Sequence, residues 1–346
     1  MTDLVNKLYR DKTLSKTEFV ELINSGESVR EDLRSLAQKL RYENYGNDIF
    51  IRGLIEFTNY CKQNCLYCGI RRDNKNCSRY RLTEEDIMSC CEEGYGLGFR
   101  TFVLQGGEDP YFTDDRLCEI ITSIKNKYPD CALTLSIGEK SRESYQRYFE
   151  CGADRYLLRH ETASKEHYER LHPKNQRFES RIECLNYLKE IGYQVGCGFM
   201  VGSPYQTTEN LAEDLLFIKK LNPQMVGIGP FIHHTDTEFK DFPDGTLEKT
   251  LLMLSIIRIM LPKVLLPATT ALATIHPRGR ELGIQAGANV VMPNLSPVSV
   301  RKKYQLYDNK VCTGEESAEC IRCLNSRVES IGCKIAISRG DSKNIR

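Results

Sequence analysis

Apolar and polar residues alternate along this chain with two different periods. In the first fifty residues apolar positions recur at helical spacing within 3–9, 16–23 and 29–40, which predicts a helical extension over residues 1–50. From residue 51 onward, short β-prone apolar runs alternate with longer amphipathic segments. The pattern therefore predicts helices first and an alternating α/β region after them.

The number of β-prone runs decides the architecture that we expect. The runs lie at 51–57, 101–105, 131–137, 154–159, 194–201, 225–231, 264–269 and 289–293. Helices are predicted after the first seven runs, at 83–96, 113–128, 141–151, 164–191, 207–221, 246–261 and 278–287. Capping sequences open several of these helices, as in Thr83-Glu-Glu-Asp86.

Eight strand–helix alternations predict an α/β fold with a complete (β/α)8 TIM-type barrel over residues 51–305. A short cysteine-containing segment, 306–346, would follow the barrel. The rival architecture is a doubly wound open sheet. Its first strand–helix turn would carry a glycine-rich phosphate loop, where this chain carries cysteines.

Composition narrows the class of function. The chain has 346 residues, with 48 Lys and Arg against 47 Asp and Glu, so no charge field of one sign attracts nucleic acid or an anionic membrane. The first residues lack the layout of a secretion signal, and no apolar run approaches membrane-spanning length. We expect a cytoplasmic protein with no nucleic-acid or membrane partner. Fifteen cysteines in such a chain favour metal or redox chemistry over a disulfide framework.

Three cysteines stand close together directly after the first run, as Cys61-x3-Cys65-x2-Cys68. Structural zinc sites and simple electron-transfer clusters use four protein ligands, so three thiolates indicate a cluster with one iron left open. Tyr67 would be the aromatic neighbour of that cluster. The alternatives are three surface thiols or half of a zinc site.

Polar residues also follow the other predicted strands, at the end of a barrel where chemistry takes place. They and their apolar neighbours are Gln105, Gly106, Gly107, Glu108, Thr134, Ser136, Arg159, His160, Glu161, Met200, Thr269, Thr270, Met292 and Asn294. Polar side chains that converge on one mouth cost desolvation free energy unless they bind something. The alternative is that they pair with each other, as Arg159 and Glu161 would.

The cysteine motif together with Gly106-Gly107-Glu108 resembles the radical S-adenosylmethionine (SAM) superfamily. Longer segments resemble, within it, the maturases that help assemble the H-cluster of FeFe-hydrogenase. These segments are 57–74, 107–111, 154–162, 225–231, 267–270 and 287–294, and the similarity runs from residue 45 to residue 333.

The resemblance implies that Cys61, Cys65 and Cys68 hold a 4Fe-4S cluster whose open iron binds SAM. One-electron cleavage would give a 5′-deoxyadenosyl radical that acts on a sulfur-containing, iron-bound cysteine precursor of the diiron subcluster. No side chain is expected to act as a catalytic acid or base. The expected cofactor contacts are Tyr67, Gln105, Gly106, Gly107, Glu108, Thr134, Ser136, Glu161, Arg181 and Met200.

By the same resemblance, Glu161 would hold the ribose hydroxyls and Arg181 the cofactor carboxylate. The alternative for Arg181 is an exposed charge on a helix. The expected substrate contacts are Arg159, Thr269, Thr270, Met292 and Tyr304. Arg159 would offer its planar fork to a substrate carboxylate. His160 would orient its neighbours rather than transfer protons.

A second cysteine group, Cys312-x7-Cys320-x2-Cys323, resembles an accessory iron–sulfur site of the 2Fe-2S or 4Fe-4S type found in some members of the maturase family. Cys333, water or a partner would supply a fourth ligand, and a zinc site or empty thiols are the alternatives. For His233 and His234 we expect solvated or hydrogen-bonded side chains rather than metal ligands. The remaining cysteines within predicted helices and strands are expected to act as small apolar residues.

The partners that the resemblance implies are a small iron–cysteine complex as substrate, a tyrosine-cleaving radical SAM maturase, a scaffold GTPase and an electron donor. Two other enzyme activities, methylornithine synthase and biotin synthase, share the barrel and the first cysteine motif. A non-catalytic iron–sulfur scaffold is the alternative from a different class, since it needs neither an open iron nor a cofactor pocket.

Overall fold

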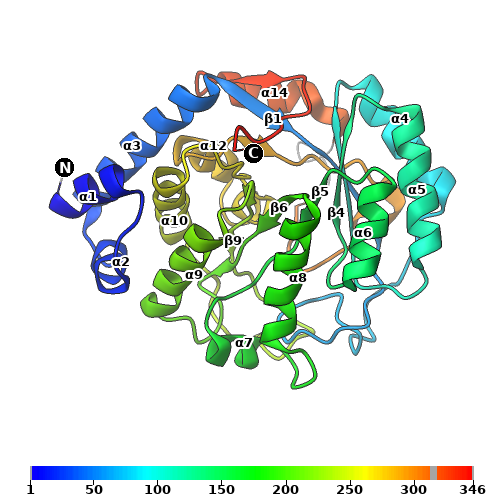
Figure 1. Ribbon diagram of the computed structural model, residues 1–346, viewed down its shortest axis with the longest axis horizontal. Coiled ribbons are helices and arrows are strands. Elements are labelled where there is room, and N and C mark those ends of the chain that lie inside the picture. The colour runs from blue at the N-terminus through cyan, green and yellow to red at the C-terminus, as the bar shows by residue number, and fades with distance from the viewer. Residues whose placement is uncertain (1, 312–317, 345–346) are drawn as a thin grey trace.

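A six-stranded parallel sheet forms the centre of the molecule, which we describe from a computed structural model over residues 2–311 and 318–344 (Figure 1). Its strand order is β2-β3-β4-β5-β6-β8. The strands are β2 (Gly53–Thr58), β3 (Thr101–Gly106), β4 (Ala132–Ser136), β5 (Arg155–Leu157), β6 (Gln194–Cys197) and β8 (Met225–Val226). Parallel neighbours need crossover connections, and helices supply them here, so the predicted alternation of strand and helix is confirmed as an α/β fold.

Helices carry the chain back from the end of one strand to the beginning of the next. They are α4 (Glu84–Gly96), α5 (Asp114–Lys127), α6 (Arg142–Glu150), α7 (Lys165–Leu171), α8 (Phe178–Ile191), α9 (Thr208–Leu221), α10 (Leu247–Met260), α11 (Thr270–Ile275) and α12 (Gly279–Gln285). The predicted cap of α4 is confirmed, because Thr83 and Asp86 form a reciprocal capping box.

The single helix predicted over 164–191 is wrong, because the structure divides it into α7 and α8. Pro173 lies between the two helices, and proline lacks the N–H that a continuing helix would use. The residue before it, His172, is extended with φ −127° and ψ 153°, as the proline ring requires. The resulting turn, 172–177, faces the cysteine loop.

Two predicted runs each divide into a pair of shorter strands. Run 194–201 forms β6 and β7 (Met200–Val201), and run 225–231 forms β8 and β9 (Gly229–Pro230). β7 and β9 pair with each other in a separate two-stranded sheet. Gly198 lies at the break in the first run, where a Cβ atom would stand 1.9 Å from the carbonyl oxygen of Gly227.

Run 264–269 does not form a strand in the structure, because its pairing is limited to isolated bridges of Leu265 to Met225 and of Pro267 to Val290. Proline has no N–H to donate to a ladder, so Pro267 removes one hydrogen bond from this run. The bridges lead to β10 (Val290–Val291), and a further bridge joins Asn294 to Leu54 in β2. Hydrogen-bonded contacts thus continue from β8 to β2 beyond the six-stranded sheet.

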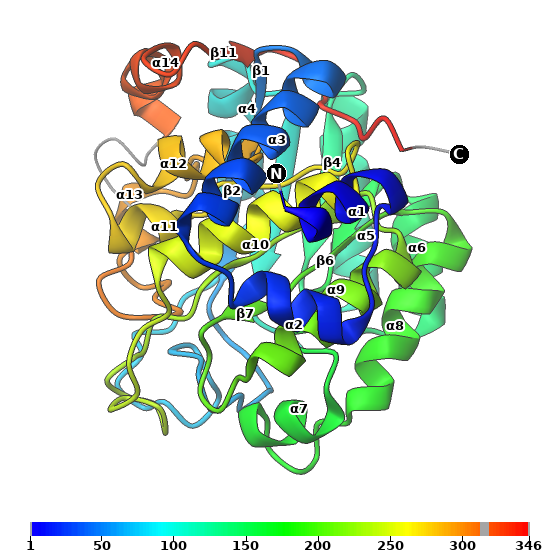
Figure 2. The same ribbon diagram turned by 90° about the vertical axis from the view of Figure 1, so that its left-hand side faces the viewer.

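The N-terminal helices are confirmed as α1 (Asp3–Asp11), α2 (Lys16–Ile23) and α3 (Glu27–Tyr45). Figure 2 shows α3 lying across α10 and α2 lying beside α9, and these pairs are in contact. β1 (Asp48–Ile51) begins inside the segment predicted to be helical and joins a three-stranded parallel sheet in the order β10-β1-β11.

The C-terminal residues return to the amino ends of the central strands. After α13 (Val298–Arg301), a 3-10 turn (Ala318–Cys320) and α14 (Ile321–Glu329), β11 (Lys334–Ala336) pairs with β1. Asp341 then accepts hydrogen bonds from Arg155 Nη2 (2.6 Å) and Gln194 Nε2 (2.8 Å), at the first residues of β5 and β6. The tail therefore covers the amino ends of the strands.

Both views place α14, which carries Cys323, and the loop that carries the first cysteine group at opposite ends of the molecule. α14 and β11 lie at the top of Figures 1 and 2, whereas α7 and the blue loop that follows β2 lie at the bottom. In the described residues no helix combines the length and the apolar character that a membrane crossing requires.

Candidate active site

The cysteine loop, residues 59–82, follows β2 and is held by one half-buried guanidinium. Arg79 donates hydrogen bonds to the carbonyl oxygens of Ile70 (2.8 Å), Arg71 (2.6 Å) and Asn74 (3.1 Å). These bonds replace the regular hydrogen bonding that a strand or helix would provide. A loop without secondary structure is thereby fixed in one conformation around its cysteines.

Cys61, Cys65 and Cys68 are half-buried free thiols in this loop. Burial, with a smaller contribution from the neighbouring charge of Cys61, raises the pKa of Cys65 to about 12. Burial also raises the pKa of Cys68, with added contributions from the charges of Cys65 and Cys61. Because Cys61 acts on Cys65, and both act on Cys68, the three thiols lie close together in one place, as the sequence predicts.

Three cysteine thiols in one loop are a donor set that suits an iron–sulfur cluster. Within 2–311 and 318–344, no three His, Cys, Asp or Glu side chains are placed to hold one metal ion. A cube of iron and sulfide keeps its cysteine sulfurs farther apart than one ion does. The pKa values raised by burial also mean that iron must displace thiol protons when the site is loaded.

Gly107 lets the end of β3 approach the cysteine loop. A Cβ atom at this position would lie 2.2 Å from the carbonyl oxygen of Tyr60 and 2.7 Å from Cβ of Cys61. Neither atom is the end of a flexible side chain, so a larger residue would displace the loop. This is a physical reason for the second glycine of the Gly-Gly-Glu segment.

Glu108 lies between the cysteine loop and the loop after β4. Its carboxylate accepts hydrogen bonds from Gln63 Nε2 (2.8 Å) and from the backbone N–H of Glu139 (3.0 Å). Lys62 Nζ stands 3.5 Å from the same carboxylate. In the structure Glu108 therefore positions the loop that carries the cysteines.

Glu161 follows β5 with a left-handed backbone, φ 64°, which is uncommon for a residue other than glycine. Its N–H donates to the carbonyl oxygen of Gly198 (3.0 Å), while the N–H of Gly198 donates to Nδ1 of His160 (3.2 Å). His160 Nε2 therefore carries the proton and faces Asp214 Oδ1 at 3.3 Å. Burial lowers the pKa of His160 to about 3, so this neutral side chain orients the backbone around Glu161.

Arg181 lies on α8 and is buried, so the alternative of an exposed helix charge is wrong. It donates from Nε to Glu139 Oε1 (2.6 Å) and from Nη1 to the carbonyl oxygen of Arg159 (2.6 Å). Arg159 Nη2 stands 3.2 Å from Glu161 Oε2. That contact is an ion pair without a hydrogen bond, since both atoms lack a hydrogen-bond partner. The predicted alternative, in which Arg159 and Glu161 pair with each other, is thus confirmed as an ion pair but not as a hydrogen bond.

The remaining predicted contacts come from several elements. Thr269 is the N-cap residue of α11 and Thr270 its first residue. Tyr304 is buried and accepts a hydrogen bond from Gln105 Nε2 (3.4 Å). Met200 packs with Leu171, Phe231 and Phe239, whereas Met292 packs with Tyr45, Phe50, Met225, Leu265 and Val290. Thr134 and Ser136 lie in the carboxyl half of β4, beside β3.

Buried polar atoms without partners mark the places where a ligand fits. Among the predicted residues they are Thr134 Oγ1, Arg159 Nε and Nη2, Glu161 Oε2 and Thr269 Oγ1. Such atoms are costly in a finished interior unless water or a ligand satisfies them. Their number, beside three interacting thiols, fits a bound cluster, a polar cofactor and a polar substrate.

Several residues at the site have no signal in the sequence pattern. Tyr168 and Gln176 come from α7 and the turn after it, and their side chains carry the unpartnered atoms Tyr168 OH and Gln176 Nε2. Lys310 donates to buried Glu56 and to the carbonyl oxygen of Tyr304 (2.9 Å). Proline at 173 signals a helix break but gives no indication of what the resulting turn contacts.

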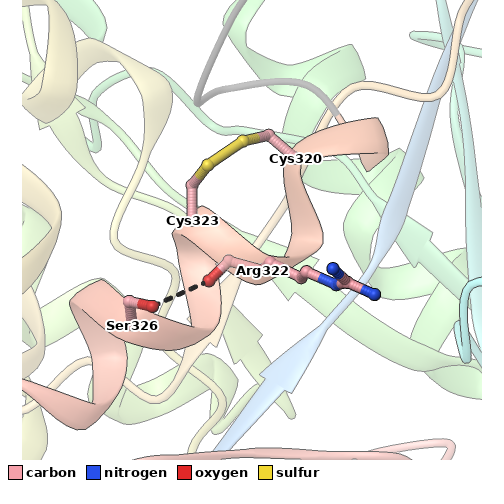
Figure 3. Close-up of a disulfide and its surroundings, with 4 residues drawn as sticks. All are labelled: Cys320, Arg322, Cys323 and Ser326. Carbon is pink, nitrogen blue, oxygen red and sulfur yellow. Dashed lines mark hydrogen bonds between the residues drawn. A yellow bond between two sulfur atoms is a disulfide. The ribbon is translucent and has the colours of Figure 1, made fainter.

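The second cysteine group differs from its predicted form. Cys312 lies outside the described residues. Cys320 and Cys323 are joined in a disulfide at the start of α14, where Ser326 Oγ donates to the carbonyl oxygen of Arg322 (3.1 Å) (Figure 3). Disulfide sulfurs do not ligate iron as thiolates do, so an accessory cluster would require reduction of this pair. Cys333, the suggested fourth ligand, is buried beside Arg41 Nη2 at 3.4 Å.

His233 Nδ1 lies 2.8 Å from Asp244 Oδ1 and is hydrogen-bonded, as expected. His234 Nδ1 accepts from the backbone N–H of Asp236 (3.0 Å).

Comparison with known proteins gives concordant results. The family model of the radical SAM superfamily matches residues 55–218. The chain is 44% identical over 343 residues to the [FeFe] hydrogenase maturase subunit HydE of Thermotoga maritima, covering 99% of this chain and 98% of the relative. It is 30% identical to 3-methylornithine synthase of Methanosarcina acetivorans over 90% of this chain and 87% of the relative.

A crystal structure of methylornithine synthase (PylB) superimposes on this structure with a TM-score of 0.85 at 29% sequence identity. The match covers 96% of this chain and 97% of that one. The fold is therefore shared almost end to end with a solved structure.

Proposed function

This chain belongs to the radical SAM superfamily and, within it, to the family of the hydrogenase maturase HydE, and from that premise we propose that it takes part in assembly of the FeFe-hydrogenase H-cluster. It is a radical SAM enzyme. The proposed reaction begins with cleavage of SAM to a 5′-deoxyadenosyl radical, which acts on a sulfur-containing, iron-bound cysteine precursor of the diiron subcluster.

The observation that carries this proposal is identity of 44% over 99% of this chain and 98% of the maturase. The geometry supports it independently. The unpartnered atoms of Thr134, Arg159 and Thr269 offer hydrogen-bonding positions to a small polar substrate beside the cysteine loop.

In the proposed mechanism Cys61, Cys65 and Cys68 hold a 4Fe-4S cluster, and SAM binds beside it. When bound, the cluster supplies one electron that cleaves the sulfonium of SAM. Glu108 and Gly107 hold the cysteine loop in place, while Glu161, fixed by His160, offers to the ribose hydroxyls its Oε2, which makes no hydrogen bond within the protein.

Arg181 and Arg159 supply the cationic groups of the site. We propose that Arg181, held by Glu139, attracts the carboxylate of the cofactor. Arg159 Nε and Nη2 make no hydrogen bond, and we propose that they grip a substrate carboxylate in a bidentate manner. The proposal assigns the remaining substrate contacts to Thr269, Thr270, Met292 and Tyr304.

The finer description of the fold is also proposed. Bridges at Leu265, Pro267 and Asn294 support a complete (β/α)8 barrel over 51–305, with a helical extension before it and a cysteine-containing segment after it. The accessory cluster at Cys312, Cys320 and Cys323 belongs to the same proposal, in the reduced state of the thiols.

The partners follow from the proposed place in assembly. A tyrosine-cleaving radical SAM maturase would deliver the iron–cysteine complex, and a scaffold GTPase would receive the product. An electron donor would reduce the cluster. The name of the T. maritima relative, a maturase subunit, supports the assignment to this assembly system.

A second candidate, methylornithine synthase, is favoured by its TM-score of 0.85 and its identity of 29%. Incubation of the anaerobically reconstituted protein with SAM, dithionite and either the iron–cysteine complex or lysine separates the two. We expect 5′-deoxyadenosine together with consumption of the complex. Methylornithine formed from lysine would favour the second candidate, and intact SAM in both reactions would favour a non-catalytic scaffold.

A further inference from the structure

The wall that covers the cysteine loop comes from α7 and the turn of residues 172–177. The backbone N–H of Leu66 donates to the carbonyl oxygen of Leu171 (3.0 Å), which joins the loop directly to the end of α7. Leu66 directly follows Cys65, so this backbone hydrogen bond fixes the distance between the cysteine loop and the wall. The wall is therefore part of the cluster site.

His172 provides the second connection. Its Nδ1 lies 2.9 Å from the carbonyl oxygen of Tyr168, which can only accept, so Nδ1 carries the proton. Nε2 then accepts a hydrogen bond from the hydroxyl of Tyr67 (3.3 Å). The ring of His172 stacks on Tyr168 at 3.8 Å between centroids. Burial lowers the pKa of His172 to about 3, so the connection stays neutral.

Gln176 lies in the same turn and contacts Cys65, the second cysteine of the motif. Its backbone N–H donates to the carbonyl oxygen of Pro173 (2.9 Å), and its side chain is buried, with 7% of the residue exposed. Oε1 lies 3.4 Å from Sγ of Cys65 and accepts from the thiol, whereas Nε2 has no partner. While Cys65 is a thiol, the Nε2 amide group of Gln176 is buried without a hydrogen-bond acceptor, which is unfavourable.

Loading the site with iron removes the thiol proton of Cys65, and a thiolate sulfur only accepts hydrogen bonds. Oε1 then has no donor to pair with at this sulfur. A half-turn of the terminal amide exchanges Oε1 and Nε2 and brings the unused N–H groups to the sulfur. The side chain is thus suited to the metal-bound state rather than to the free thiol.

We propose that Gln176 donates a hydrogen bond from Nε2 to the cluster-ligating sulfur of Cys65 and thereby raises the reduction potential of the cluster. The inference rests on the proposed function, because it presupposes that Cys65 ligates a cluster. A donor at a ligand sulfur stabilises the more negative, reduced cluster, and hydrogen bonds to the sulfurs are among the factors that set such potentials. Gln176 is a positioning residue that acts through Cys65.

The test measures the midpoint potential of the reconstituted cluster by a redox titration followed by electron paramagnetic resonance. We expect Gln176→Leu to keep the iron and sulfide content of the wild type and to show a lower potential. Gln176→Glu, which keeps the size and replaces the donor with an acceptor, should lower the potential further. Asn175→Leu, on an exposed neighbouring residue, is the matched control and should leave the potential unchanged.

Two outcomes overturn the inference. The first is a wild-type potential in a Gln176→Leu protein that holds its full iron content. The second is failure of both Gln176 variants to hold iron while they remain folded by circular dichroism, because the amide would then be needed to build the site and not to tune it. Absence of a cluster in the wild type would instead refute the proposed function.

Discussion

The two cysteine groups share a Cys-x2-Cys pair but lie in different surroundings. Cys65 and Cys68 are free thiols in a loop held by Arg79 and Glu108, at the end of the molecule where α7 lies. Cys320 and Cys323 form a disulfide at the start of α14, at the opposite end.

The difference shows that surroundings, and not spacing, distinguish the two groups. Around the first group, buried polar atoms of Thr134, Glu161 and Gln176 have no hydrogen-bond partner within the protein. Near the second group, Arg327 Nε donates to Glu281 Oε1 (2.8 Å), which ties α14 to α12. We therefore propose that the first group lies in a binding site, whereas the second lies at the start of a helix with a structural attachment.

The largest effect is expected from removal of a thiolate in the first group. Cys68→Ser should lose about four irons per chain, because three cysteines are needed to hold the cube. Cys77→Ser, in the same loop, is the control and should keep them. Iron and sulfide analysis after anaerobic reconstitution measures the difference, and a full cluster in Cys68→Ser would contradict the assignment.

Substitutions in the tail that follows the second group should lower the stability of the fold and leave SAM cleavage unchanged. Hydrogen bonds from Arg155, Gln194 and Arg339 hold the pKa of Asp341 below its ordinary range, although burial opposes them. A depressed carboxyl pKa stabilises the fold above the ordinary aspartate value of about 4, and this stabilisation is lost as pH falls below it.

We therefore expect Asp341→Asn to lower the free energy of unfolding by about 2 kcal/mol at neutral pH, the scale of hydrogen bonds to charged groups. The difference from the wild type should shrink in acid. Denaturant titrations at pH 7 and pH 3 measure it, with exposed Asp241→Asn as the control. A loss of SAM cleavage in folded Asp341→Asn would show that the tail acts on the site.

Arg159→Lys should lower kcat/KM for the iron–cysteine substrate about tenfold, because lysine cannot form the bidentate contact with a carboxylate. SAM cleavage without substrate should persist, which separates this residue from the cluster ligands. Steady-state kinetics with Arg170→Lys as an exposed control makes the comparison. Equal losses in both reactions would place Arg159 at the cofactor instead.

The smallest effect on cleavage is expected at the second group. After reduction, Cys320→Ser should lose the iron bound there and retain wild-type SAM cleavage, since α14 lies far from the cysteine loop in both views. Iron analysis and product assays on one preparation measure both quantities. Complete loss of cleavage would mean that the second site is not accessory.

Local periodicity was sufficient to predict the strands and helices that contact their sequence neighbours. It failed where a backbone feature intervened. Pro173 breaks the helix expected over 164–191, and Pro267 limits the seventh run to bridges. The sequence pattern includes the start of β1 in the helical extension because the partner of β1, the strand β11, is distant in sequence.

The residues of the candidate site also fall into those that the sequence could predict and those that it could not. Residues that follow a strand closely, such as Arg159 and Glu161 after β5, could be placed near the site because strand ends converge. Gln176, Asp214 and Lys310 could not, because each reaches the site from a helix or a distant loop whose contacts depend on tertiary packing. Unpartnered buried atoms, which no sequence pattern encodes, reveal Gln176.

The central claim is that the first cysteine group, and not the second, supports SAM cleavage. The direct test measures 5′-deoxyadenosine released by the wild type, Cys65→Ser and Cys320→Ser after anaerobic reconstitution and addition of dithionite. We predict product from the wild type and from Cys320→Ser, and none above background from Cys65→Ser. Product from Cys65→Ser, or intact SAM with a fully loaded wild type, would contradict the account.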